Sequence, residues 1–168
     1  MKLIINKLQY ILLSFFICTS LVSCFPKYED LEAEEAAKID KYLRDNPAIQ
    51  FDLKSSGLYY RDIVLGTGIA PVTGDTVYIF YTGTFLDGTL IETNVGKNDT
   101  LKAALNKKQL IEGLDEAVSY MKVGGKSNLL IPSKLAYGST GNYYSVPGFT
   151  PMLFDIQLIK VKQMFAGK

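Results

Sequence analysis

The sequence contains no histidine, no tryptophan and only two cysteines among its 168 residues. Without histidine, the catalytic triads and general bases that use an imidazole are excluded, and so are the usual zinc sites. The 18 Lys and Arg residues are nearly balanced by 17 Asp and Glu residues, so there is no positive excess to neutralise a nucleic-acid backbone. We therefore expect no metal site and no nucleic-acid partner, and any catalysis must work without imidazole.

The amino-terminal stretch, residues 1–23, has the pattern of a secretory signal. Two early lysines precede an apolar run from Tyr10 to Val22, which is short for a membrane span. The run ends in Leu21-Val22-Ser23-Cys24, which resembles a bacterial lipobox, the motif whose cysteine is lipidated and becomes the first mature residue. The alternatives are an ordinary signal with a small residue before the cut and an uncleaved anchor. We expect a cell-envelope protein anchored through a lipid on Cys24, in the outer membrane facing the periplasm, with the inner membrane and surface display left open.

The segment after the signal is acidic and has apolar residues at roughly helical spacing. Glu34 with Lys38 and Asp40 with Arg44 are favourable i,i+4 pairs. The Asn46-Pro47 pair should end the helix, because a residue before proline avoids the α conformation. The pattern fits a helical spacer that holds a domain off the membrane and fits equally a surface helix packed beside that domain.

Beyond the spacer, the sequence changes to short β-like runs separated by glycine. These runs are Leu58–Leu65, Thr76–Thr82, Ser127–Ile131 and Met152–Val161. Asp87-Gly88 is a hairpin signal, and one helix is predicted over Gln109–Met121, ended by Gly124-Gly125. This order predicts an α+β domain, an antiparallel sheet with one helix across it.

The chain is expected to hold one domain, because 48% hydrophobic and 21% charged residues are an ordinary globular composition. We divide it into four segments: a lipoprotein signal (1–23), an acidic helical spacer (24–52), the α+β domain (53–163) and a carboxy-terminal tail (164–168). A monomer is the default expectation.

Short motifs follow one another in a particular order from about Ser56 to Val161. They are Gly74-Asp-Thr-Val77, Tyr81-Thr-Gly83, Asp87-Gly88, Leu110-Ile-Glu-Gly113, Met121-Lys-Val-Gly-Gly125, Ile131-Pro132, Leu135-Ala-Tyr-Gly138, Val146-Pro147 and Leu153-Phe-Asp155. Each is weak alone, but the ordered set resembles the FK506-binding-protein (FKBP) family of peptidyl-prolyl cis-trans isomerases. The resemblance implies a twisted antiparallel β half-barrel wrapped around the helix Leu110–Met121, an apolar proline pocket between them and no cofactor.

The activity that the resemblance implies needs no histidine. Rotation about an Xaa-Pro bond meets a barrier of ~18 to 20 kcal/mol from amide resonance, and no proton has to move to cross it. A pocket accelerates rotation by favouring the twisted amide over the planar one. The implied partners are Xaa-Pro segments of unfolded or exported proteins and FK506-like macrolides. The alternative from another class is an FKBP-fold chaperone or peptide-binding module with little or no isomerase activity.

The resemblance assigns catalytic roles to five residues. Tyr81 matches one wall of the pocket, and Phe154 would close it from the last strand. Ile111 matches the position whose backbone N–H binds a substrate carbonyl, and Tyr137 the tyrosine whose hydroxyl donates to one. Glu92 stands where the family has an aspartate that orients the site, and its extra methylene is expected to misplace the carboxylate.

The resemblance also implies a set of substrate-binding residues. They are Ile91, Leu101, Leu110, Leu114, Val146 and Pro147. Val146 and Pro147 belong to a loop over the rim of the pocket. Ile91 and Leu101 stand where the family commonly has phenylalanine, and Leu114 where it often has a tryptophan floor. Because aromatic surface is lost, the sequence predicts reduced rather than absent catalysis and weaker inhibitor binding.

Overall fold

The computed structural model describes residues 27–97 and 99–164. The signal segment and the lipobox with Cys24 lie outside the described residues. Within the described ranges, no helix has the length and apolar character needed to cross a membrane. The chain divides into a short unit, Met1–Leu31, and the unit Glu32–Lys168, which holds the fold described below.

Helix α2 spans Tyr28–Asp45. It ends where the sequence predicts, because the backbone N–H and the side-chain amide of Asn46 both donate to the Tyr42 carbonyl, at 3.1 and 2.9 Å, and Pro47 cannot continue the helix. The expected ion pair between Glu34 and Lys38 forms at 2.9 Å. The expected ion pair between Asp40 and Arg44 does not form within the described chain. In this last turn Lys41 pairs with Asp45 instead.

One face of α2 is buried. Glu35 and Ile39, four residues apart, are 8% and 6% exposed. Residues at this spacing lie one above the other on a helix. Of the two interpretations that the sequence leaves open, the contacts within the unit Glu32–Lys168 favour a surface helix packed beside the domain.

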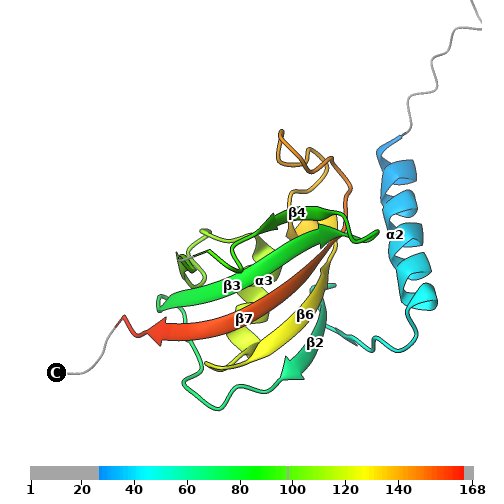
Figure 1. Ribbon diagram of the computed structural model, residues 1–168. Coiled ribbons are helices and arrows are strands. Elements are labelled where there is room, and N and C mark those ends of the chain that lie inside the picture. The colour runs from blue at the N-terminus through cyan, green and yellow to red at the C-terminus, as the bar shows by residue number, and fades with distance from the viewer. Residues whose placement is uncertain (1–26, 98, 165–168) are drawn as a thin grey trace, which may run out of the picture. The chain divides into compact units, whose positions relative to one another are not determined.

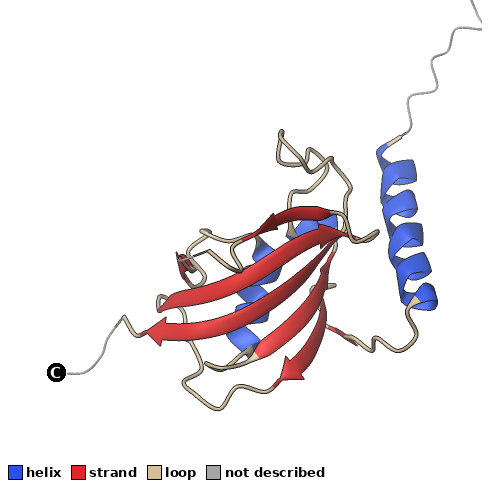
Figure 2. Cartoon of the chain, in the orientation of Figure 1, coloured by secondary structure: helices blue, strands red, loops and turns tan. Residues whose placement is uncertain are grey.

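Seven strands of the described chain form one antiparallel sheet (Figures 1 and 2). They are β1 (Asp52–Leu53), β2 (Tyr59–Val64), β3 (Thr76–Phe85), β4 (Leu90–Thr93), β5 (Leu101–Ala104), β6 (Lys126–Ile131) and β7 (Met152–Lys162). The strand order is β1-β2-β6-β7-β3-β4, and β5 pairs with the first half of β3. The longest pairing joins β3 to β7, from Thr76 opposite Lys162 to Phe85 opposite Met152.

The predicted hairpin joins β3 to β4. The Phe85 N–H donates to the Thr89 carbonyl at 2.9 Å, and the Asp87 side chain accepts the Thr89 N–H at 2.9 Å. Gly88 takes a φ of 86°, a value that favours glycine. Strands β1 and β5 are not among the predicted runs, because segments of two and four residues are too short to show a period.

Helix α3 spans Glu112–Tyr120, shorter at both ends than predicted. Ile111 and Met121 flank it in extended conformations, with ψ of 148° and 163°. The prediction that Gly124-Gly125 ends the helix is wrong, because the chain already leaves the helix at Met121, whose side chain is 3% exposed in the core. Gly124, at a φ of 89°, belongs to the turn that leads to β6.

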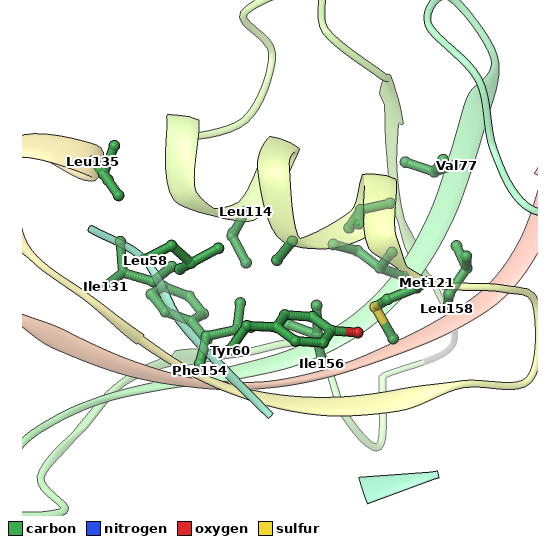
Figure 3. Close-up of a cluster of buried hydrophobic side chains, with 14 of the residues drawn as sticks. Leu58, Tyr60, Val77, Leu114, Met121, Ile131, Leu135, Phe154, Ile156 and Leu158 are labelled. Atoms are coloured by element: carbon green, nitrogen blue, oxygen red, sulfur yellow. The ribbon is translucent and has the colours of Figure 1, made fainter. Parts of the chain in front are cut away.

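The hydrophobic core lies between α3 and the sheet, which twists around the helix (Figures 1 and 3). Leu114 of α3 and Met121, the residue after α3, face Phe154 and Ile156 of β7. The helix approaches β6 so closely that a Cβ at Gly113 would lie 2.5 Å from Cγ2 of Ile131. The predicted α+β class is therefore confirmed.

Candidate active site

A pocket of about 350 Å³ opens between α3 and the sheet. It is lined by Tyr81, Glu92, Leu101, Lys108, Gln109, Leu110, Ile111, Leu114, Tyr137 and Phe154. All five predicted catalytic residues and three of the predicted substrate-binding residues, Leu101, Leu110 and Leu114, are in this set. Residues far apart in the sequence are thus brought to one cavity.

Three predicted substrate-binding residues do not line the pocket. Val146 is 3% exposed and belongs to the core, while the exposed Pro147 lines a different groove. Ile91 packs against the core, because its place in β4 turns it away from the side on which Glu92 lies. Lys108 and Gln109 also line the pocket, but the sequence gives no sign of this, because both are polar and Gln109 reads there only as the start of the predicted helix.

The aromatic wall of the pocket consists of Tyr81 and Phe154. Their ring centroids are 6.2 Å apart with the planes tilted by 35°. Phe154 is 2% exposed, and its ring lies over Gly83 on the adjacent strand, where a Cβ would come within 2.8 Å of the ring. Gly83 therefore provides the space that sets Phe154 beside Tyr81.

The backbone of Tyr81 is held by Asn94, which follows β4. The Asn94 carbonyl oxygen Oδ1 accepts the Tyr81 N–H at 2.8 Å, and its amide Nδ2 donates to the Ile79 carbonyl at 3.0 Å. The side chain thus takes the place of a neighbouring strand at this point of β3. A single asparagine after a strand gave no signal of this role in the sequence.

Replacing Asn94 with alanine should lower the free energy of unfolding by about 1 to 3 kcal/mol, because the partly buried Tyr81 N–H loses its acceptor. Urea unfolding measures the change. Asn94→Asp keeps an acceptor for the Tyr81 N–H but places a carboxylate oxygen against the Ile79 carbonyl where the amide donated, so it should also be destabilising. Equal stability of the alanine variant and the wild type would contradict this role.

Glu92 acts on both pocket tyrosines. Burial, together with the charge of Glu92 and a hydrogen bond to it, raises the pKa of Tyr81 to about 12. Burial and the charge of Glu92 also raise the pKa of Tyr137. Glu92 lines the same pocket as both tyrosines, and whether its extra methylene changes the orientation of the site stays a prediction. Both hydroxyls stay protonated at neutral pH.

Two hydrogen-bond donors of the pocket are unused by the described chain. The Tyr137 hydroxyl donates to no described residue, and the Ile111 N–H, just before α3, has no described acceptor. The Ile111 carbonyl, by contrast, accepts the N–H groups of Leu114 and Asp115. A donor at a helix N-terminus is favoured for binding an electron-rich oxygen. The pocket can therefore bind carbonyl groups at two points.

The remaining lining gives the pocket an apolar floor. Leu114 is 5% exposed, and Leu101 and Leu110 are partly buried against the same core. Within residues 27–97 and 99–164, no group of acidic or cysteine side chains is arranged to hold a metal ion. The cavity combines this apolar floor and the aromatic wall with the polar residues Glu92, Lys108 and Gln109 and with two donors unused by the described chain. This lining is suited to an apolar ring flanked by amide carbonyls.

Comparison with known proteins agrees with this geometry. The profile of the family described as FKBP-type peptidyl-prolyl cis-trans isomerase matches residues 68–159. The chain belongs to this family. The matched range runs from just before β3 to within β7 and includes every residue that lines the pocket.

The chain is also similar to individual proteins and solved structures. The chain is 35% identical over 127 residues to an FKBP-type 22 kDa peptidyl-prolyl cis-trans isomerase of Escherichia coli, covering 75% of this chain and 61% of that protein. It is 33% identical over 158 residues to a chloroplastic protein of Arabidopsis thaliana named photosynthetic NDH subunit of lumenal location 4, covering 87% of this chain and 70% of that protein. The crystal structure of FkpA from Escherichia coli superposes with a TM-score of 0.71 at 28% identity, covering 94% of this chain and 72% of that one. The chain spans less than two thirds of the length of several curated FKBP relatives that it matches.

Proposed function

We propose that this protein is a peptidyl-prolyl cis-trans isomerase acting on Xaa-Pro segments of unfolded proteins. The observation that carries the proposal is the pocket itself, in which apolar walls from β3, β7 and α3 surround two unused donors, the Tyr137 hydroxyl and the Ile111 N–H. Family membership supports the same activity.

In the proposed mechanism, the proline ring enters the cavity between Tyr81, Phe154 and Leu114. The prolyl amide then leaves water, which favours the twisted amide, whose charge separation is smaller than that of the planar amide. Tyr137 and Ile111 donate to the carbonyls that flank the bond and hold one side of the substrate while the other rotates. Every group in this scheme keeps its protonation state throughout.

The mechanism predicts a flat pH profile. Because the pKa of Tyr81 is about 12 and that of Tyr137 is raised, both hydroxyls remain protonated below about pH 10. We expect kcat/KM for a proline peptide to be nearly constant from about pH 5.5 to 8 and to fall only in alkali, as the tyrosines lose their protons. NMR exchange rates at several pH values measure this profile. A bell-shaped profile within that range would contradict a mechanism without proton transfer.

We further propose that the protein is lipidated on Cys24 and faces the periplasm from the outer membrane, where its clients are exported proteins. The signal-like run and the lipobox-like Leu21-Val22-Ser23-Cys24 support this proposal. Growth with a labelled palmitate analogue should label the wild type and leave Cys24→Ser unlabelled. Label on both, or on neither, would contradict lipidation at Cys24, and membrane fractionation of the wild type tests the outer-membrane location.

A peptide-binding module or chaperone is the second candidate function. The leucine at position 114 of the pocket floor favours it, because an aliphatic floor offers a proline ring less aromatic surface. One relative, 33% identical to this chain, is named as a photosynthetic NDH subunit and not as an isomerase, which is compatible with a binding role for this fold. Binding of proline peptides without faster exchange would select this candidate.

A further inference from the structure

Helix α2 contacts the domain through a buried carboxylate. Glu35 is 8% exposed, and charged side chains are rarely buried unless their polar atoms are paired. Its Oε1 accepts the backbone N–H of Ser133 at 2.6 Å, and its Oε2 accepts the hydroxyl of Ser133 at 2.5 Å. Both partners belong to one residue that lies 98 positions away in the sequence.

The two hydrogen bonds between the Glu35 carboxylate and Ser133 are both buried. Ser133 is itself only 4% exposed. In residues 27–97 and 99–164, no lysine or arginine forms an ion pair with Glu35, so its two hydrogen bonds to Ser133 are what stabilise the buried carboxylate. Loss of these bonds would leave a buried N–H without an acceptor, which is strongly unfavourable.

Ser133 in turn fixes the backbone on both sides of Tyr137. It opens the short helix η1 (Ser133–Leu135), and its carbonyl accepts the N–H of Ala136 at 2.8 Å and the N–H of Gly138 at 2.7 Å. The residue between these two donors is Tyr137, whose side chain lines the pocket. A hydrogen-bonded path therefore runs from the Glu35 carboxylate through Ser133 to the backbone N–H groups of Ala136 and Gly138, the two residues next to Tyr137.

We infer that Glu35 of α2 is a positioning residue for the Tyr137 hydroxyl, an inference that rests on the proposed isomerase function. Among the described residues, Glu35 forms no hydrogen bond or ion pair with a residue that lines the pocket, so we infer that it acts through Ser133. Helix α2 is then part of the functional unit, and a fragment limited to residues 53–163 would lack this contact.

Substitutions at Glu35 test the inference in the full-length protein in detergent. Glu35→Ala removes both acceptors and should lower kcat/KM for a Leu-Pro peptide by about fivefold, well below the hundredfold loss that a displacement of about 1 Å can cause. Glu35→Gln should restore most of the activity, because its carbonyl can accept the Ser133 N–H and its amide can donate to the Ser133 hydroxyl. Glu34→Ala is the matched control, since Glu34 is a neighbouring exposed glutamate whose ion-pair partner among the described residues is Lys38. It should leave kcat/KM unchanged.

A double-mutant cycle separates positioning from a merely structural effect. If Glu35 acts through the Tyr137 hydroxyl, Glu35→Ala should cause no further loss of kcat/KM in a Tyr137→Phe background. An equal loss in both backgrounds would overturn the inference. All rates are compared at a temperature where thermal unfolding shows each variant to be folded.

A second readout keeps this inference separate from the proposed function. With ¹³C-labelled tyrosine, the Tyr137 ring signal should shift in Glu35→Ala and stay in place in Glu34→Ala. A wild type without isomerase activity would refute the proposed function, and the ring signal would then decide the link between Glu35 and Tyr137. An unmoved signal in Glu35→Ala would overturn that link.

Discussion

Replacing Phe154 with alanine should lower the free energy of unfolding by about 3 to 5 kcal/mol, as expected for removal of a buried phenylalanine. Phe154 is 2% exposed and belongs to the core that α3 and the sheet share. Its ring also fills the space over Gly83, so the substitution leaves a cavity that the sheet backbone cannot close. Because domains are stable by only about 5 to 15 kcal/mol in total, this variant should unfold at much lower urea concentration.

The same ring is a wall of the pocket, and a conservative variant separates its two roles. Phe154→Leu keeps most of the volume and should destabilise by only about 1 kcal/mol, yet it removes the ring that faces Tyr81. We expect a folded protein with a clear loss of kcat/KM for proline peptides. Unchanged activity in Phe154→Leu would show that the aromatic wall does not contact the substrate. A loss of stability below about 1 kcal/mol in Phe154→Ala would contradict its place in the core.

Replacing Tyr137 with phenylalanine should lower kcat/KM by about three- to tenfold while leaving the fold intact, because one neutral hydrogen bond contributes about 0.5 to 1.5 kcal/mol. The Tyr137 hydroxyl donates to no described residue, so its removal breaks no hydrogen bond within the described chain. Urea unfolding should therefore give the wild-type value. NMR exchange on a Leu-Pro peptide measures the activity.

The chain offers a matched control for this prediction in the same loop. Tyr144 is 97% exposed, and Tyr144→Phe removes a hydroxyl that does not line the pocket. It should leave both activity and stability unchanged. Equal losses in Tyr137→Phe and Tyr144→Phe would contradict a specific role for the Tyr137 hydroxyl.

The sequence predicts the parts of the fold that have a long, regular pattern. The alternation around Thr76–Thr82 identifies β3, and the apolar face of Gln109–Met121 identifies α3. The same patterns do not locate the ends of these elements, because the ends depend on tertiary packing. Met121 leaves the helix to enter the core, whereas the sequence pointed to the following glycines as the end.

For the candidate site, too, the sequence indicates some residues and leaves out those whose position depends on tertiary packing. Tyr81, Ile111, Tyr137 and Phe154 meet in one pocket, as the family resemblance implies. The sequence does not indicate that Val146 is buried in the core, because a valine in an irregular loop has no periodic neighbours that would show whether its side chain points inward.

The sequence also gives no indication of the roles of Glu35 and Asn94, for a related reason. A glutamate at position 35 of an acidic helix fits a solvated surface, and only the fold brings Ser133 against it. Likewise, Asn94 contacts β3 because the β3–β4 hairpin folds the chain back against that strand. Contacts between distant segments are thus the part of the site that local patterns leave out.

The most direct test of the account is NMR exchange spectroscopy on a short Leu-Pro peptide with and without the folded protein. Uncatalysed cis-trans exchange takes tens of seconds or longer, so catalysis is readily seen. We predict faster exchange that is lost when FK506 is added and is reduced in Tyr137→Phe. A protein shown to be folded that leaves the exchange rate unchanged would contradict the isomerase function.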